Sequence, residues 1–407
     1  MSETIQKQSY KQTEVGLIPV DWERIRVDKV ITVARGGSPR PIQDFVSLSS
    51  NGLNWIKIGD TSSKSKYIVS SKEKIKPEGA QFSREVNVGD FILSNSMSFG
   101  RPYILKIDGC IHDGWLVLQN YQDAFDREFL YYTLMSKDVY NQYIMKASGS
   151  SVLNLNKEIV KTVELNRPTD IEEQNAIATA LSDMDELLTS LEQLISKKQA
   201  IKQGAMQELL TPPHKGGKRL PGFSGEWEEK KLGDLALINM GQSPLSGNYN
   251  LSGNGLPLVQ GNADIQKRKT IVRNYTSQIT KTANRGDIIM SVRAPVGEIA
   301  TASFKCCIGR GVCSIKYQND FLYYYLIYIE HSWSKFSTGS TFDSINSNQL
   351  RGINVSLPES LKEQKAIAQV LSDMDEEIKV LEEKKDKYQK IKGGMMQELL
   401  TGKIRLV

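Results

Sequence analysis

A long internal repeat is the feature that most constrains how this chain can fold. The string LSDMDE occurs at residues 181–186 and again at residues 371–376. A gapless alignment extends the match to residues 172–211 and 362–401, in which 24 of 40 positions are identical. Identity of this extent at one constant offset indicates an internal duplication. The chain therefore contains two copies of one structural element, separated by most of a domain.

Both copies are predicted to be long helices that pair as a coiled coil. Apolar residues recur in alternating steps of four and three, which is the seam spacing of a coiled coil. Asp170-x-x-Glu173 and Ser360-x-x-Glu363 have the pattern of capping boxes at the start of each helix. The predicted seam positions are Ile177, Leu181, Met184, Leu188, Leu191, Ile195, Ile367, Leu371, Met374, Ile378, Leu381 and Tyr388.

The charge pattern of the repeats predicts how the two helices pair. Acidic residues gather in the first half of each copy, and lysines gather in the second half. Parallel pairing would set like charges against each other, whereas antiparallel pairing sets acid against base. We therefore expect an antiparallel pair with a pseudo-two-fold axis between the helices.

The segments that precede the two helices repeat only as a skeleton. Residues 20–39 and 225–244 share a Trp-Glu pair and a Ser-Pro pair, and residues 89–104 and 286–300 share Gly-Asp and an apolar run. The string FLYY also occurs once in each flank. Strand-like runs are kept while the loops between them diverge. The chain is therefore a tandem of variable domain, helix, variable domain and helix.

This organisation predicts an α+β protein in which two α/β domains are separated by the two long helices. The variable domains are expected at residues 1–165 and 216–357, and the helical spacers at residues 166–215 and 358–407. A length of 407 residues suits two or three domains. A composition of 39% hydrophobic and 24% charged residues is typical of a packed protein.

No segment is expected to enter a membrane. The longest strongly apolar run, FLYYYLIYI at residues 321–329, is far shorter than the roughly 20 residues of a membrane-spanning helix. The N-terminal residues 1–16 are polar and lack the apolar core of a signal peptide. We therefore expect a cytoplasmic protein.

The sequence carries no recognisable catalytic set. Dinucleotide, P-loop, nucleophile-elbow and HExxH motifs are missing, as is the Asx-Pro-Pro-aromatic tetrapeptide of adenine methyltransferases. The four cysteines form no CxxC pairs and only three histidines are present, so we expect buried free thiols rather than a zinc site or a disulfide framework. The thiols concerned are Cys110, Cys306, Cys307 and Cys313.

The basic residues are distributed unevenly. The net charge is only +5, but the excess lies in the variable domains, and QKRKTIVRN at residues 266–274 is strongly basic. Such a cluster can neutralise phosphates. It can equally be an ordinary solvated strand face, and charge alone does not distinguish the two.

The two helix entries resemble those of a known family. NRPTDIEEQNAIATALSDMD and SLPESLKEQKAIAQVLSDMD each carry Pro, Glu-Gln, Ile-Ala and Leu in register, and each follows a divergent domain. GGSP at Gly36, GQSP at Gly241, and the segments WIKIGD and PLVQGN match recurring loops of that family. In these features, and over essentially its whole length, the chain resembles the specificity subunits of type I restriction-modification enzymes.

The resemblance implies a DNA reader that is not itself an enzyme. Each target-recognition domain would read one half of an asymmetric, bipartite double-stranded DNA site, and the helices would act as a ruler and docking surface. Two modification subunits would carry S-adenosylmethionine and methylate a flipped adenine. Restriction subunits would add translocation and cleavage with ATP and Mg²⁺. Helix faces around Leu187, Leu194 and Met206 are candidates to receive partners, or alternatively to complete the coiled-coil core.

Candidate DNA-binding residues lie in loops at matching places of the two domains. Arg can hold guanine, and Asn or Gln can hold adenine, so loops rich in these residues suit base readout. Ser-Pro and Gly in such loops are also ordinary turn formers. The base-reading candidates are Arg35, Ser38 and Arg40 with Gln242 and Ser243; Lys57 and Asp60 with Gln260 and Asn262; and Ser94, Asn95 and Arg101 with Ser291 and Arg293. The phosphate-contact candidates are Lys267, Arg268, Lys269 and Arg273.

Two other interpretations remain open from the sequence. The chain could be a protein-interaction scaffold with two ligand-binding modules on a coiled-coil spacer, which would bind no DNA. It could also be an enzyme with an unrecognised active site, for which Cys306 and Cys307 are the place to look. Neither explains why the loops diverge while the helices and their entries stay nearly identical.

Overall fold

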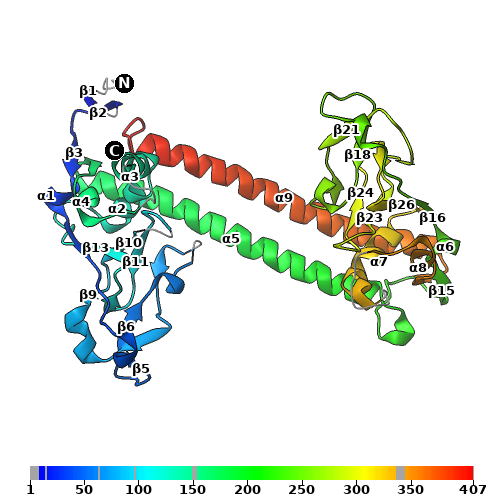
Figure 1. Cartoon of the computed structure of the whole chain (residues 1–407), viewed down its shortest axis with the longest axis horizontal. Coiled ribbons are helices and arrows are strands. Elements are labelled where there is room, and N and C mark those ends of the chain that lie inside the picture. Colours follow the sequence, from blue (N-terminus) through cyan, green and yellow to red (C-terminus); the bar gives the residue numbers. More distant parts are fainter. Residues whose placement is uncertain are drawn as a thin grey trace. The chain divides into compact units, whose positions relative to one another are not determined.

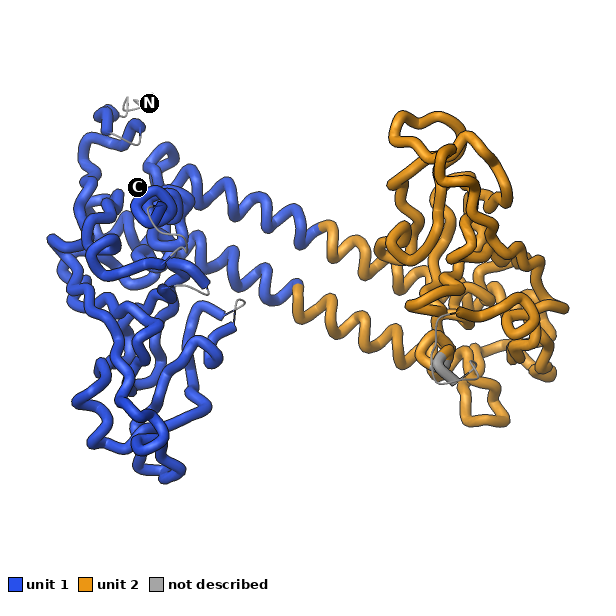
Figure 2. Tube along the Cα trace, viewed as in Figure 1, with its two compact units in different colours: residues 1–191, 384–407 blue, residues 192–383 orange. Residues whose placement is uncertain are grey.

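The chain folds into two compact units, and each unit contains one variable domain together with parts of both long helices. Figure 1 shows the elements and Figure 2 the units in a computed structural model. Unit 1 comprises residues 1–191 and 384–407, and unit 2 comprises residues 192–383. Each of the two spacer segments contributes part of its length to each unit. The structure describes residues 9–13, 16–62, 65–95, 98–148, 154–335 and 344–406.

The two repeats form two long helices, as predicted. α5 (Ile171–Leu209) and α9 (Leu361–Leu399) are each 39 residues long and begin at matching positions of the repeat (Figure 1). α5 ends just before Thr211-Pro-Pro, because proline has no backbone N–H and cannot continue the helix. A rise of about 1.5 Å per residue gives each helix a length of about 60 Å.

The helices run antiparallel within each unit, with acid against base. In unit 2, Lys198 Nζ lies 2.5 Å from a carboxylate oxygen of Glu377, and Lys202 Nζ lies 2.5 Å from Asp375 Oδ1. As the residue number rises along α5, the number of the paired residue on α9 falls, as expected for antiparallel helices. In unit 1, Lys392 of α9 pairs with Asp185 of α5 in the same sense. The predicted charge matching is confirmed.

The predicted seam residues differ in their degree of burial. Ile177, Leu181, Ile367 and Leu371 are fully buried because they pack into the cores of the adjoining variable domains. Leu191, Ile195 and Ile378 are also buried, whereas the remaining seam positions are half-buried. The seam positions that pack into the domain cores are therefore the most completely buried.

The start of α5 differs from the predicted capping box. Asp170 does cap the helix, since its Oδ1 accepts a hydrogen bond from the Glu172 backbone N–H at 2.9 Å. Glu173 does not turn back to the cap. Its Oε2 accepts from Trp22 Nε1 at 3.2 Å, and its two oxygens bind the guanidinium of Arg405. The prediction is wrong for Glu173 because a tertiary partner outcompetes the local bond.

At the start of α9, Glu363 likewise binds a distant arginine instead of the backbone of the helix cap. The carboxylate of Glu363 accepts from Arg219 Nε at 2.9 Å and from Arg219 Nη2 at 2.8 Å. Both Glu173 and Glu363 are buried, and a buried charge is costly unless it is paired, so each arginine is a stabilising contact. The arginines come from related segments, GGKRLPGF after α5 and TGKIRLV after α9. Each segment therefore closes the entry of the other helix.

Unit 1 consists of mixed sheets flanked by helices. Two five-stranded sheets have the orders β4-β13-β10-β11-β7 and β5-β8-β6-β12-β9, and β14 pairs with β3 beside them. The helices are α1 (Val27–Val30), α2 (Arg127–Leu134), α3 (Lys137–Ala147) and α4 (Lys157–Lys161). The strands are β1 (Tyr10–Thr13), β2 (Gly16–Pro19), β3 (Trp22–Arg26), β4 (Thr32–Arg35), β5 (Val46–Ser47), β6 (Leu53–Ile56), β7 (Tyr67–Ile68), β8 (Glu73–Ile75), β9 (Arg84–Val86), β10 (Phe91–Ser94), β11 (Pro102–Leu105), β12 (Gly109–Ile111), β13 (Trp115–Gln119) and β14 (Glu164–Pro168).

Unit 2 repeats this topology. Its sheets have the orders β16-β26-β23-β24-β20-β19 and β17-β21-β18-β25-β22, and β15 pairs with β27. The helices are α6 (Leu232–Leu235), α7 (Phe321–Tyr328) and α8 (Ser347–Arg351). The strands are β15 (Trp227–Lys231), β16 (Leu237–Met240), β17 (Tyr249–Asn250), β18 (Leu256–Val259), β19 (Ile265–Gln266), β20 (Lys269–Thr270), β21 (Asn274–Thr276), β22 (Thr282–Ala283), β23 (Ile288–Ser291), β24 (Ile299–Thr301), β25 (Cys306–Ile308), β26 (Val312–Lys316) and β27 (Asn354–Pro358). Two repeated domains with mixed sheets and long helices confirm the predicted fold class.

The central strands read as continuous apolar runs because both faces of their sheet are covered. On β10, Phe91 and Leu93 join the core that contains α2 and α5, whereas Ile92 joins the core between the two sheets. Ile288 and Ile289 on β23 divide in the same way between the two cores of unit 2. Successive side chains of a strand point to opposite faces, so such strands show no polar alternation.

A three-part contact explains the duplicated LSDMDE in unit 1. Tyr132 of α2 donates its hydroxyl hydrogen bond to Asp185 Oδ2 at 2.7 Å. Lys392 of α9 forms an ion pair with the same carboxylate, and its Nζ lies 5.6 Å from the centroid of the Tyr132 ring. The fifth residue of the string thus joins the variable domain, its own helix and the opposite helix. We refer to this as the Asp–Lys–Tyr junction.

Unit 2 has the same junction built from the second copy. Tyr324 of α7 donates to Asp375 Oδ2 at 3.1 Å, and Lys202 Nζ lies 2.5 Å from Asp375 Oδ1. Lys202 Nζ also lies 5.5 Å from the centroid of the Tyr324 ring. Each copy of the string therefore makes equivalent contacts, one with a tyrosine of its variable domain and one with a lysine of the opposite helix.

The helix faces proposed for partner docking differ in exposure. Met206 is only 7% exposed and packs in the core of unit 2, so it does not belong to an open face. Leu194 is exposed and Leu187 is half-buried. Met206 therefore contributes to the core of unit 2, and the docking role of Leu187 and Leu194 stays a prediction.

The apolar run at residues 321–329 is a domain-core helix. α7 (Phe321–Tyr328) covers most of it and is buried at Phe321, Leu322, Tyr324, Tyr325 and Leu326. Throughout the ranges that the structure describes, the helices fall short of the combined length and hydropathy that crossing a bilayer requires.

Candidate nucleic-acid interface

Each unit presents a loop that is held against the turn that connects its two sheets. In unit 1 the Ser-Pro loop, residues 36–39, lies against the connecting turn, residues 112–115, between β12 and β13. Gly36 N–H donates to Trp115 O at 2.9 Å, and a Cβ on Gly36 would lie 2.0 Å from His112 O. Glycine is therefore required for this close approach. Ser38 Oγ donates to Asp113 Oδ1 at 2.9 Å, which fixes the loop to the turn.

The Ser-Pro loop of unit 2, residues 241–244, is held in the same way. Its connecting turn, residues 309–312, lies between β25 and β26. Gly241 N–H donates to Val312 O at 3.0 Å, and a Cβ on Gly241 would lie 2.1 Å from Gly309 O. Ser243 Oγ accepts from the Arg310 backbone N–H at 3.1 Å. Gln242 uses its backbone N–H to bond Ile308 O at 2.9 Å, and its side chain is not part of the clamp.

The neighbouring loops after β6 and β18 are built around an aspartate. Asp60 Oδ2 accepts from the Lys57 backbone N–H at 2.8 Å, and Asp264 Oδ2 accepts from the Gln260 backbone N–H at 2.6 Å. The structural counterpart of Asp60 is therefore Asp264, and the expected pairing of Asp60 with Asn262 is corrected. The loop of unit 2 is one residue longer. Asn262 lies on its exposed surface.

A pocket of about 350 Å³ gathers three of the predicted residues of unit 1. Ser38, Arg40 and Lys57 line it together. Lys57 forms an ion pair with Glu73, and Arg40 Nη2 lies 3.6 Å from Asp113 Oδ2 with a side chain that is 83% exposed. The lining residues that were not predicted are Pro39, Ile42, Val46, Trp55, Glu73, His112 and Asp113.

His112 is held as a neutral imidazole in this pocket. Burial lowers its pKa below the ordinary value, Lys57 lowers it further, and Asp113 opposes the shift. The Gly114 backbone N–H donates to His112 Nδ1 at 2.7 Å, and the Ile58 N–H points to Nε2 at 3.3 Å. A neutral imidazole has one acceptor nitrogen, so the shorter contact, from the Gly114 N–H to Nδ1, is the hydrogen bond that holds the turn. Protonation of His112 would place a hydrogen on Nδ1 and remove this bond.

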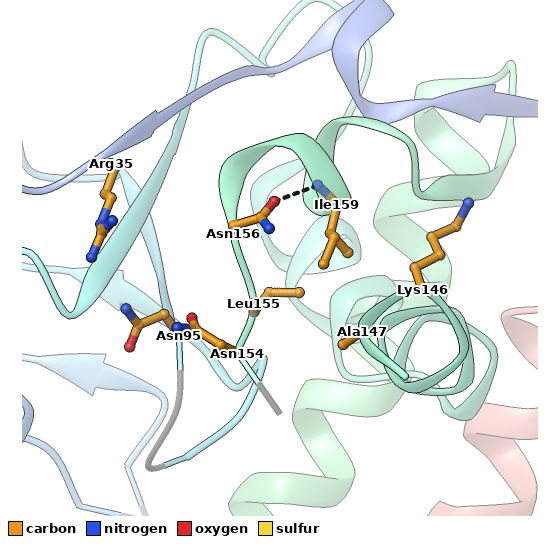
Figure 3. A pocket seen from close by; sticks show the side chains of 8 residues that line it. All are labelled: Arg35, Asn95, Lys146, Ala147, Asn154, Leu155, Asn156 and Ile159. Carbon is orange, nitrogen blue, oxygen red and sulfur yellow. Dashed lines mark hydrogen bonds between the residues drawn. The ribbon is translucent and has the colours of Figure 1, made fainter. Parts of the chain in front are cut away.

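A second pocket is lined in part by residues that bond the same connecting turn. It has a volume of about 290 Å³, and its side chains are shown in Figure 3. Arg35 Nε and Asn95 Nδ2 both donate to Asp113 O, at 3.1 and 3.4 Å. The lining is basic or amide-bearing at its polar positions, which suits an anionic ligand. The lining residues are Arg35, Asn95, Lys146, Ala147, Asn154, Leu155, Asn156 and Ile159.

Ser94 and Ser291 hold turns within their units. Both are fully buried. Ser94 Oγ accepts from the Ser98 N–H at 3.2 Å, and Ser291 Oγ donates to Pro295 O at 2.7 Å while accepting from the Glu298 N–H at 2.9 Å. In this conformation neither hydroxyl is accessible to a nucleic acid.

The two arginines predicted beside these serines lie closer to the surface. The guanidinium carbon of Arg101 lies 5.4 Å from the centroid of the Tyr103 ring, so this side chain is stacked within unit 1. Arg293 is exposed and forms an isolated backbone bridge with Ser344. Whether either contacts DNA stays a prediction.

The basic cluster of unit 2 divides into one arginine that is paired with a glutamate and several exposed cations. Arg268 Nη1 and Nη2 donate to the two carboxylate oxygens of Glu330 at 2.7 and 2.6 Å, so its charge is already matched. Lys267 and Arg268 have φ values of +48° and +61°, a left-handed conformation that non-glycine residues seldom adopt. This tight turn between β19 and β20 projects Lys267 and Lys269 into solvent. Arg273 is exposed too, with Nη1 3.9 Å from Asp264 Oδ1.

The cysteines are buried free thiols, as predicted. Burial raises the pKa of Cys110 to about 11, and it raises the pKa of Cys306 and Cys313 to about 12 each. A thiol with such a pKa is protonated at neutral pH and is a poor nucleophile. An active site centred on Cys306 is therefore disfavoured.

The connecting turns were not predicted from the sequence, although it contains a signal for them. Cys-Ile-x-x-Gly occurs at residues 110–114 and again at residues 307–311. Aligning these strings would have placed His112 opposite Gly309 and Asp113 opposite Arg310.

Comparison with known proteins agrees with this architecture. Residues 19–203 and 224–390 match the family model described as type I restriction modification DNA specificity domain. The putative type I restriction enzyme MjaX specificity subunit of Methanocaldococcus jannaschii is 32% identical over 98% of this chain and 97% of its own length. The MjaVIII specificity subunit of the same organism is 25% identical, with the same coverage of both chains.

Solved structures share the fold. A chain from a study of complex assembly and conformational transition of the type I R-M system has a TM-score of 0.66 and 25% identity, and it covers 95% of this chain and 99% of that one. The crystal structure of the HsdS subunit from Thermoanaerobacter tengcongensis has a TM-score of 0.50 and 26% identity, with 95% and 98% covered.

Proposed function

Because this chain belongs to the family of type I restriction-modification specificity subunits, we propose that its two variable domains read the two halves of an asymmetric, bipartite DNA site. One observation carries the proposal. Equivalent backbone hydrogen bonds hold unlike side chains at matching positions of the two units. Lys57, His112 and Asp113 stand in unit 1 where Gln260, Gly309 and Arg310 stand in unit 2. Two domains that share a backbone arrangement but carry different surface side chains are suited to bind two different half-sites.

We propose that phosphate contacts position the domains and that the clamped loops read bases. Exposed Lys267 and Lys269 extend from a tight turn, as expected of side chains that neutralise phosphates. Reversing the charge of either should weaken binding to all sequences alike and reduce the salt dependence by about one counterion. Arg268 is the matched control, because its charge is already paired with Glu330.

The long helices are proposed to set the gap between the half-sites. The ion pairs between α5 and α9 make each helix support the other, so their length rather than a flexible linker would define the spacing. Half-sites about one helical turn apart, ~34–36 Å, lie on one face of B-DNA. Four residues added to both helices lengthen them by about 6 Å, close to two base pairs.

We further propose that modification subunits dock on this chain and supply the methyl-transfer chemistry with S-adenosylmethionine. Restriction subunits would add cleavage with ATP and Mg²⁺, and the complex would work in the cytoplasm, where its DNA is. This chain would contribute sequence choice and no catalytic step.

A selection with random DNA tests the whole proposal. The full chain, assembled with modification subunits, is incubated with duplexes that contain a randomised segment, and bound DNA is sequenced. The proposal expects two short conserved blocks separated by a fixed unconserved gap. A chain with the lengthened helices should keep both blocks and accept a longer gap. A single uninterrupted motif, or no enrichment at all, would contradict it, and the latter outcome would favour a scaffold that binds no DNA.

A further inference from the structure

One surface position carries opposite charges in the two units although its backbone surroundings are the same. Asp113 and Arg310 each occupy the second position of a connecting turn. The turn in unit 1 is closed by a bond from the Trp115 N–H to His112 O at 3.1 Å, and that in unit 2 by a bond from the Val312 N–H to Gly309 O at 3.1 Å. Both turns are clamped by the serine of the Ser-Pro loop.

In unit 2 the turn is packed so closely that its position is fixed. A Cβ on Gly311 would lie 2.1 Å from Gln260 O, and a Cβ on Gly309 would lie 3.1 Å from Gln260 Cγ. Because the Arg310 N–H is bound to Ser243 Oγ, the backbone that carries this side chain has little freedom. The side chain itself is exposed. Within the part of the chain that the structure describes, its guanidinium forms no ion pair, so it is available to a ligand.

In unit 1 the same position carries a carboxylate that is partly neutralised in place. Burial opposes its ionisation, but the hydrogen bond from Ser38 Oγ and the nearby charges lower the pKa of Asp113 below its ordinary value. Arg40 Nη2 lies 3.6 Å away, and Arg35 Nε donates to the backbone carbonyl of the same residue at 3.1 Å. These cations reduce the repulsion that a bare carboxylate would meet from DNA phosphates. The side chain is still 44% exposed, and it has lone pairs to spare.

We propose that the residue at this position reads a base edge directly in each unit, with Arg310 reading guanine and Asp113 reading the amino group of cytosine. A guanidinium donates two parallel hydrogen bonds to guanine O6 and N7, and a carboxylate accepts from cytosine N4. The inference rests on the proposed function. The inference extends that function by naming the bases. It assigns specificity to two residues that were not among the DNA-binding candidates predicted from the sequence.

The alternative role for Arg310 is a phosphate contact, and charge-preserving substitution separates the two. Lysine keeps the positive charge but cannot form the planar two-bond contact with guanine. Arg310→Lys therefore preserves attraction to phosphate and removes base reading, whereas Arg310→Ala removes both. Lys316→Ala is the matched control, because Lys316 is an exposed cation at the far end of β26, the strand that follows the turn.

The test repeats the random-duplex selection at one salt concentration with the full chain and four variants. Wild type is expected to enrich guanine at one position of one half-site and cytosine at one position of the other. Arg310→Lys and Arg310→Ala should each reduce the guanine preference by about 10- to 100-fold, which is within the discrimination of one bidentate contact. Asp113→Asn should reduce only the cytosine preference. Lys316→Ala should change neither.

Distinct outcomes overturn the inference and the proposed function. If wild type selects a bipartite motif and both Arg310 variants retain it unchanged, the inference fails and the proposed function stands. If Arg310→Lys retains the motif while Arg310→Ala weakens binding to all sequences alike, Arg310 contacts a phosphate and the inference fails again. If wild type selects no sequence, the proposed function falls and the inference falls with it. Circular dichroism of each variant excludes unfolding as the cause of a lost preference.

Discussion

Replacing Asp185 by asparagine tests whether the Asp–Lys–Tyr junction holds unit 1 together. Asparagine has nearly the same shape, so packing is preserved while the negative charge is removed. The change breaks the ion pair with Lys392 and weakens the hydrogen bond that Tyr132 donates at 2.7 Å. The two helices and the variable domain would then lose their common charged contact.

The expected cost lies between the values for surface and buried ion pairs. The side chains of Asp185 and Lys392 are 37% and 22% exposed. Exposed pairs contribute about 0.2–1 kcal/mol, whereas removal of one partner of a buried pair costs about 3–5 kcal/mol. Discounting for the remaining solvent, we expect a loss of about 1–2 kcal/mol in the free energy of unfolding. For a unit of this size that lowers the unfolding midpoint by about 2–8 °C.

A double-mutant cycle measures the coupling itself. Scanning calorimetry measures the unfolding of Asp185→Asn, of Lys392→Met and of the double variant. The coupling energy is the difference between the stability lost in the double variant and the sum of the losses in the two single variants. Asp183→Asn is the control, because Asp183 belongs to the same LSDMDE string but is exposed. A coupling energy indistinguishable from zero, or an equal loss from Asp183→Asn, would refute the role given to the junction.

Three further predictions concern the helix entry and the connecting turn. Arg405→Ala leaves the buried carboxylate of Glu173 without its cation and should cost about 3–5 kcal/mol in urea unfolding, whereas Arg405→Lys should recover part of that loss. Because burial lowers the pKa of His112, the unfolded state binds the proton more readily, so the stability that His112 contributes is complete above pH 6.5 and is lost as the pH falls through the folded pKa. The protection factor of the Gly114 amide, which is its exchange rate corrected for the intrinsic pH dependence, should fall over that range, and His112→Gln should abolish this pH dependence. Gly36→Ala places a Cβ 2.0 Å from His112 O and should destabilise the Ser-Pro loop, which a loss of DNA binding together with an early thermal transition would reveal.

The helices could be predicted from the sequence because their determinants are local and repeated. The steps of four and three, the acid-to-base polarity and the Thr211-Pro-Pro stop fixed the two helices, their antiparallel pairing and the end of α5. The roles of Glu173 and Glu363 were mistaken because their partners, Arg405 and Arg219, are distant in sequence. A capping box is a local pattern and cannot reveal a competing tertiary contact.

The site was harder to predict because clamped loops depend on close approach rather than on residue type. The Ser-Pro loops were identified correctly as repeated elements, but what they bind was not, since the connecting turns lie about 70 residues further along the chain. Arg268 looked like a free cation in the sequence, and only the fold brings it to Glu330. Ser94 and Ser291 looked like surface polar residues, yet both sheets bury them.

The discontinuity of unit 1 has a consequence for biosynthesis. Unit 2 is one uninterrupted segment, whereas the core of unit 1 includes Leu399 and Leu400 and is closed by Arg405. A ribosome adds about 5–20 residues per second, so the nascent first domain would wait on the order of 10–40 s for its missing helix. During that delay the side of the core that Leu399 and Leu400 cover would be open to solvent and would attract chaperones. Limited proteolysis of stalled ribosome complexes should find the later domain protected first, and early protection of the leading domain would count against this order.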